Sequence, residues 1–242
     1  MWFPKWAYDP KYLPSIENLP EIQPDSQTWN FGFSDFIAHN PLWTPFQLLN
    51  QEFIEWISNE LLKVIKEISN ENIKILEVWA WNWRLSYFLK KDLIIEKTKK
   101  SVEIIATDDF SWFTDEFEEN CQSDMFFEKC KWIDVENLNV EKSIKKYNPN
   151  IIISSWMPHK EDWTELFRKN ENVDAFLIIW NVDECWTDNT WKECDEFELK
   201  ELNVKWNISW KDGLDNISYI KSNWYNPTSK VVLFKRKKIN QK

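Results

Sequence analysis

The chain has 242 residues, of which 43% are hydrophobic and 29% are charged, the balance of a globular protein with one well-formed core. Its formal net charge of −10 argues against a broad basic surface for nucleic acid. No apolar stretch is long enough to cross a bilayer and the N-terminus lacks a signal-peptide core, so we expect a cytoplasmic protein with no membrane partner.

Glycine is almost missing from the chain, whereas tryptophan is abundant. The sequence has 2 glycines and 18 tryptophans, although a domain of this length is expected to hold about 17 glycines. Trp186 and Trp191 lie among Thr, Asp and Asn, where turns are expected. We interpret about 15 tryptophans as glycine in the native protein, because UGA, which encodes glycine in some bacterial lineages, was translated as tryptophan. Trp156 and Trp163 are candidates for genuine tryptophans. The alternative is a truly Trp-rich protein that binds carbohydrate or aromatic ligands.

The N-terminal region differs in pattern from the segment that follows it. Residues 1–44 are rich in Pro, Asn and aromatic residues without periodicity, which favours an arm or lid. His39 lies in this arm and is a candidate substrate contact. From residue 46 to 68, apolar residues recur at steps of three and four, which predicts an amphipathic helix. We therefore place the main domain at residues 45–238.

Short runs rich in β-branched residues then alternate with helical stretches. The runs lie at residues 73–78, 102–107, 131–135, 150–155, 175–179 and 230–235. Such alternation is typical of βαβ units. It predicts a doubly wound α/β fold with a mainly parallel sheet and helices on both faces.

The first predicted strand ends in Ile75-Leu-Glu-Val-Trp-Ala-Trp-Asn-Trp-Arg84. If Trp79, Trp81 and Trp83 are read as glycine, the segment resembles motif I, E-x-G-x-G-x-G, of the class I S-adenosylmethionine-dependent methyltransferases. Glycine suits this turn because its backbone must contact the cofactor and the next helix must start close to the strand. The resemblance implies a seven-stranded Rossmann-like sheet. It also implies that Glu77 faces the methionine end of the cofactor through water.

A dinucleotide-binding loop, G-x-G-x-x-G, is the main alternative for this segment. A loop of that kind beginning at position 79 needs glycine at position 84. The chain has Arg84 there, which is neither glycine nor tryptophan, so recoding cannot supply the glycine. The methyltransferase interpretation is therefore favoured over an NAD-binding enzyme.

Acidic residues follow the next two predicted strands. Asp108 ends the second strand, where a carboxylate can accept hydrogen bonds from both hydroxyls of an unphosphorylated ribose. Asp109 competes for this role, and a solvated loop charge is the alternative for both residues. The resemblance implies that Asp134, after the third strand, binds the adenine amino group.

The fourth predicted strand ends in Ile151-Ile-Ile-Ser-Ser-Trp-Met-Pro-His159, followed by Lys-Glu-Asp-Trp-Thr164. The resemblance implies that its end, including Ser155, lies near the cofactor and the acceptor. His159 and Asp162 are candidates for a general base, with Glu161 beside them, although methyl transfer depends mainly on alignment. His159 as a simple packing residue is the alternative. The segment differs from the Asn/Asp-Pro-Pro-Tyr motif of amino-methylating enzymes, which argues against methylation of nucleic-acid bases.

Cysteine spacing gives no indication of a metal. The four cysteines form two pairs, Cys121/Cys130 and Cys185/Cys194, each nine positions apart. Neither has the C-x-x-C spacing of a zinc site, so we expect free or buried thiols and no metal. The sequence as a whole predicts a cytoplasmic enzyme that transfers a methyl group from S-adenosylmethionine to a small molecule or a protein. A methyltransferase-like binding protein without turnover is the alternative.

Overall fold

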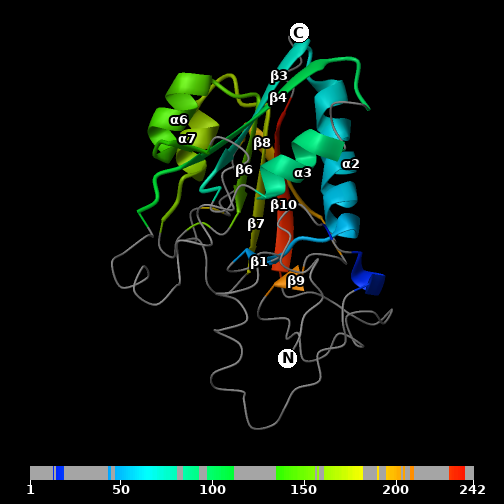
Figure 1. Cartoon of the computed structure of the whole chain (residues 1–242). Helices are drawn as coiled ribbons and strands as arrows, with labels where there is room; N and C mark the ends of the chain where they lie inside the picture. Colours follow the sequence, from blue (N-terminus) through cyan, green and yellow to red (C-terminus); the bar gives the residue numbers. More distant parts are fainter. Residues whose placement is uncertain are drawn as a thin grey trace.

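The computed structural model describes residues 13, 15–18, 43–44, 47–80, 84–92, 97–111, 135–155, 157, 161–181, 190, 195–202, 204, 208–209 and 229–237. Within these residues one seven-stranded sheet is flanked by helices on both faces (Figure 1). This confirms the predicted doubly wound, Rossmann-like α/β fold. No helix in this part of the chain is long and apolar enough to cross a membrane.

The large sheet has the spatial order β5-β4-β3-β6-β7-β10-β8. Its strands are β3 (Asn72–Val78), β4 (Ser101–Asp108), β5 (Val135–Asn137), β6 (Ile151–Ser155), β7 (Ala175–Asn181), β8 (Phe197–Leu202) and β10 (Ser229–Arg236). The strands from β5 to β7 run parallel, whereas β10 is antiparallel to both of its neighbours, β7 and β8. Chain order reverses direction between β3 and β6, because β4 lies on one side of β3 and β6 on the other. This reversal defines the switch point at which ligands bind in open α/β sheets.

Two helix layers cover the sheet (Figure 1). The helices are α2 (Gln51–Glu67), α3 (Arg84–Asp92), α6 (Val140–Tyr147) and α7 (Thr164–Lys169). In the picture α2 and α3 lie on one side, and α6 and α7 lie on the other. The strand residues Ile73 and Ile75 are buried with α2 and α3, while Leu76 and Val78 are buried with α6 and α7. This alternation is what strands covered on both faces require.

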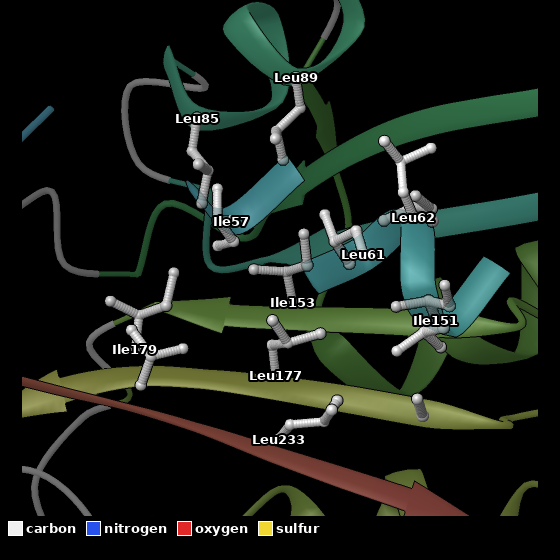
Figure 2. Close-up of a cluster of buried hydrophobic side chains, with 14 of the residues drawn as sticks. Ile57, Leu61, Leu62, Leu85, Leu89, Ile151, Ile153, Leu177, Ile179 and Leu233 are labelled. Carbon is white, nitrogen blue, oxygen red and sulfur yellow. The ribbon is translucent and has the colours of Figure 1, made fainter. Parts of the chain in front are cut away.

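The core on the α2 and α3 face is made mainly of aliphatic side chains from both helices and from the central strands, with Phe53 and Phe88 among them. Figure 2 shows part of it, with Ile57, Leu61, Leu62, Leu85, Leu89, Ile151, Ile153, Leu177, Ile179 and Leu233 labelled. The side chain of Leu61 is fully buried there. The sheet and its two adjoining helices therefore form a fixed frame behind the ends of β3 and β6.

Helix α2 begins later than its hydrophobic period suggested. The sequence predicted a helix from residue 46, but Gln47–Leu48 form strand β2 and the helix starts at Gln51. The side chain of Asn50 accepts a hydrogen bond from the Phe53 N–H at 2.8 Å, which caps the first turn. The early start was wrong because the apolar Leu49 continues the helical period into the cap region.

A second, three-stranded sheet joins distant parts of the chain. Strand β1 (Trp43–Thr44) pairs with β2, which pairs in turn with β9 (Ile208–Ser209), all antiparallel. The described part of the N-terminal region also docks on α2. The Ile16 N–H and the Ser15 hydroxyl, at the short 3-10 helix Ile16–Asn18, donate hydrogen bonds to the Glu52 carboxylate. The division into an arm and a domain stays a prediction.

Candidate functional site

The carboxyl ends of β3, β4 and β6 meet at the switch point. Val78 lies beside Thr107 of β4 and beside Ser154 of β6. The residues that follow these three positions are Trp79 after Val78, Asp108 after Thr107 and Ser155 after Ser154. They therefore lie at the same carboxyl edge of the sheet. Residues that the sequence placed in one cofactor site are brought together by the parallel register of the three strands.

Trp79 has a backbone conformation that suits glycine. Its φ is 58°, in the left-handed region, which costs about 1–2 kcal/mol for a residue with a Cβ atom. The Ala80 N–H donates to the Thr107 carbonyl at 3.1 Å and holds the turn against β4. Among the tryptophans that the structure describes, Trp79 is the one with positive φ. Trp81 and Trp83 lie outside the described residues.

The indole of Trp79 fills part of the edge where a ligand is expected. The residue is 9% exposed, and its ring lies against Trp163 with 5.5 Å between centroids and 54° between planes. A motif I turn needs bare backbone at this position so that the cofactor can approach. The literal residue therefore does not fit S-adenosylmethionine at this turn.

Glu77 connects the end of β3 to the start of α3. The Ser86 N–H donates to Glu77 Oε2 at 3.0 Å, and the Ser86 hydroxyl donates to the same oxygen. Ser86 lies in the first turn of α3, where a carboxylate satisfies an otherwise unpaired amide and complements the helix dipole. The resemblance to motif I implied that Glu77 faces the methionine end of a cofactor, and this stays a prediction. The structure shows that Glu77 also joins the end of β3 to the first turn of α3.

Burial controls the protonation of Glu77. Removal from water raises the pKa of Glu77 from 4.5 to about 7. The hydrogen bonds from Ser86 lower this pKa, and the nearby negative charge of Asp108 raises it. The residue is 3% exposed, so the start of α3 is held by a buried group that changes charge near neutral pH.

Asp108 lies at the carboxyl end of β4, beside the end of β3 that carries Glu77. It is 1% exposed, and its Oδ1 accepts a hydrogen bond from the Phe110 N–H at 2.7 Å. Phe110 also has a positive φ, of 54°. Asp109 is half-buried, and its Oδ1 accepts from the Ser111 N–H at 3.0 Å. Asp108 thus ends β4 at this edge and its role in binding ribose stays a prediction, while Asp109 stabilises its own turn.

Two buried hydroxyls end strand β6. Ser154 is fully buried and Ser155 is 9% exposed, and neither Oγ has a hydrogen-bond partner among the described residues. An unsatisfied buried polar group costs about 1–3 kcal/mol, so such groups indicate a missing partner. Strand alternation directs Ser155 to the face of Ile153 and α3, and Ser154 to the face of Ile152. Sequence reasoning named Ser155 but missed Ser154 and Ser86.

Of the other predicted site residues, some are described by the structure and the rest lie outside the described part. Asp162 is half-buried, and its Oδ1 accepts hydrogen bonds from the Thr164 N–H at 2.9 Å and the Thr164 hydroxyl at 2.5 Å. Glu161 is exposed. His159, Asp134, Trp156, His39 and the four cysteines lie outside the described residues. Within the described ranges, no group of His, Cys, Asp and Glu side chains could hold a metal ion.

Comparisons with known proteins give distant likenesses to solved structures. No protein-family model matches the sequence, and no curated protein matches it. The chain is 10% identical to the 23S rRNA methyltransferase ErmE, with a TM-score of 0.43 over 78% of this chain and 69% of ErmE. The chain is 13% identical to the CMeT domain of the citrinin polyketide synthase, with a TM-score of 0.44. This match covers 87% of this chain and 59% of that chain. The chain is 12% identical to an S-adenosylmethionine-dependent O-methyltransferase from Thermotoga maritima, with a TM-score of 0.41. This match covers 81% of this chain and 68% of that chain.

Proposed function

We propose that this protein is an S-adenosylmethionine-dependent methyltransferase whose native form has glycine at positions 79, 81 and 83. The positive φ of Trp79 at the switch point carries the proposal. The side chain strains this turn, and the residue lies where a backbone turn would contact the cofactor. Asp108 on the neighbouring strand supports the same site.

Backbone conformation separates the tryptophans in the way that recoding predicts. Trp56 lies inside α2, packs against the core and stacks on Phe53 with 6.4 Å between ring centroids. Glycine there would cost about 1 kcal/mol in helix propensity. Trp163 has φ −89° and ψ −6°, which any residue adopts. We therefore expect UGA codons at 79, 81 and 83 and UGG codons at 56, 156 and 163, and the gene sequence tests this. UGG at position 79 would refute recoding there.

The residues that would bind the cofactor follow from the site. S-adenosylmethionine supplies a methyl group bonded to a positively charged sulfur. Asp108 is proposed to accept hydrogen bonds from the ribose, and Asp134 is proposed for the adenine amino group. Glu77 fixes the start of α3, and Ser155 offers a hydroxyl without a described partner. The turn at position 79, once bare, allows close backbone contact.

The acceptor is proposed to be a small molecule or a protein. The net charge of −10 and the acidic edge disfavour a polyanionic acceptor such as nucleic acid. His159 and Asp162 remain proposed candidates for a general base, although the Asp162 carboxylate is also engaged with Thr164 at the start of α7. The reaction is proposed to take place in the cytoplasm.

Calorimetric titration tests the cofactor. The literal chain is compared with a restored chain that carries Trp79→Gly, Trp81→Gly and Trp83→Gly. We expect the restored chain to bind S-adenosylmethionine and the literal chain not to bind it, because the indole at position 79 occupies the approach to the turn. Preference of the restored chain for NAD, or equal affinity of both chains for S-adenosylmethionine, would refute the proposal. Formation of S-adenosylhomocysteine with cell extract separates an enzyme from a binding protein.

A further inference from the structure

Strand β8 lies at one end of the large sheet. Among the described residues it pairs on one side, with β10. Its sequence is Phe-Glu-Leu-Lys-Glu-Leu, and the four residues in its middle are exposed. Leu199 is 47% exposed and is the one large hydrophobic side chain in the described part of the chain that is exposed. An edge strand of this kind is a template for pairing with another strand.

The register of β8 with β10 shows which backbone groups point away from the sheet. The Lys237 N–H donates to the Glu196 carbonyl at 2.7 Å, one step beyond the last pair of the register. Hydrogen-bonded pairs alternate along an antiparallel ladder, so every second residue from Glu196 directs its N–H and C=O toward β10. The residues between them are Phe197, Leu199 and Glu201. Their N–H and C=O groups point to the side on which no described strand lies.

The side chains of β8 separate charge from apolar surface. Leu199 lies opposite Phe234, whose side chain is buried on the α6 and α7 face. Strand alternation therefore places Glu198 and Lys200 on the α2 and α3 face. Glu198 lies there opposite Lys235, with 3.8 Å between the carboxylate and the ammonium group. The outer edge of that face thus carries one negative and one positive charge, separated by one residue.

Backbone direction and charge together select one register for two copies of β8. Outward groups of one strand must face outward groups of the other, so the symmetry centre falls on a residue. With the centre at Glu198 or at Lys200, that residue meets its own copy, and like charges face each other. With the centre at Leu199, the two leucines meet and each Glu198 faces the Lys200 of the other copy. This register also pairs all three outward residues of both strands.

We propose that the chain forms a twofold symmetric dimer in which β8 pairs antiparallel with β8 of a second copy, centred on Leu199. The two seven-stranded sheets then join into one continuous sheet. A lysine on an edge strand ordinarily discourages such pairing. Here the Glu198 of the other copy neutralises Lys200. Since β8 contains no tryptophan, the dimer depends neither on recoding nor on the proposed function.

Analytical ultracentrifugation of the full-length chain tests the dimer. We expect the average mass to rise from 29.5 kDa toward twice that value as the concentration increases. Glu198→Lys creates two pairs of like charges and should weaken dimerisation by about 10- to 100-fold, as should Lys200→Glu. The chain with both changes has opposite charges in register again and should dimerise like the parent. Glu165→Lys, the same change at an exposed position on α7, should have no effect.

Mixing the two single variants tests the register itself. When Glu198→Lys and Lys200→Glu chains are combined, each altered position faces the opposite charge, so a dimer should form that neither variant forms alone. Both side chains are exposed, so neither change disturbs the core. A mass of 29.5 kDa at every concentration would overturn the proposal, whether β8 is bare or covered by another segment. A dimer that neither charge reversal weakens would also overturn it, because the copies would then meet through another surface.

Discussion

Replacement of Glu77 by glutamine tests the buried charge at the centre of the site. The pKa of Glu77 is about 7 in the folded protein and 4.5 for the ordinary group. Because the folded pKa is the higher one, protonation favours the folded state. Its stabilising contribution is complete below pH 4.5 and is lost as the pH rises through about 7. Each pKa unit corresponds to about 1.4 kcal/mol, so the unfolding free energy should fall by about 3 kcal/mol across this window.

Glutamine has nearly the same shape and does not titrate. Its carbonyl can still accept a hydrogen bond from the Ser86 N–H. The difference in unfolding free energy between Glu77→Gln and the parent should therefore shift in favour of the variant by about 3 kcal/mol between pH 4.5 and pH 8. Urea unfolding followed by circular dichroism at a series of pH values measures this difference directly, and other titrating groups cancel in the comparison.

Glu136 provides a control because its pKa is shifted in the opposite direction from that of Glu77. Hydrogen bonds from Lys146 and Tyr147 lower the pKa of Glu136, which is exposed to solvent. Its contribution is present above the ordinary pKa and is lost as the pH falls, so Glu136→Gln should differ from the parent in its slope at acidic pH and not between pH 5 and 8. If Glu77→Gln also shows a constant difference between pH 5 and 8, Glu77 is not a buried carboxyl with a raised pKa.

Three further substitutions test the ligand and the frame. In the restored chain, Asp108→Asn removes charge-assisted hydrogen bonds to the ribose. Calorimetry should therefore show about a 10- to 100-fold weaker affinity for S-adenosylmethionine. An unchanged Kd would contradict the ribose role of Asp108. Asn50→Ala leaves the Phe53 N–H unpaired and should lower stability by about 1 kcal/mol in urea unfolding, whereas no loss would mean that the cap is replaced. Leu61→Ala should cost about 2–5 kcal/mol, since the side chain is fully buried; a cost below 1 kcal/mol would contradict the core.

The central sheet was predictable because its strands are continuous apolar runs. Ile151–Ser155 is buried along its whole length, and such runs are typical of parallel strands covered on both faces. β8 was missed because Phe197–Leu202 is an edge strand with four consecutive exposed residues and no apolar period. The third predicted strand, at 131–135, overlaps β5 at Val135, and its other residues lie outside the described part. The pairing of β2 with β9 joins two-residue segments far apart in the sequence, which no local pattern reveals.

The site was predictable to the extent that its residues end strands. Glu77 and Asp108 were expected to share one edge because both are acidic residues at the carboxyl ends of parallel strands, and the register of β3 with β4 confirms this neighbourhood. The contact between Glu77 and Ser86 was missed, although a Ser in the first turn after an acidic strand end is a signal that could have found it. The partnerless hydroxyl of Ser154 depends on three-dimensional burial and has no counterpart in the sequence.

The composition and the backbone bear independently on position 79. The shortage of glycine is a property of the whole chain and does not say which tryptophan is out of place. The positive φ of Trp79 is local, and it arises from the register of β3 with β4, which fixes the turn whatever side chain the turn carries. The indole thus occupies the edge where we propose that a ligand binds. β3 and β4 contain no tryptophan, so the strands on either side of the turn have the same sequence whether or not position 79 is recoded.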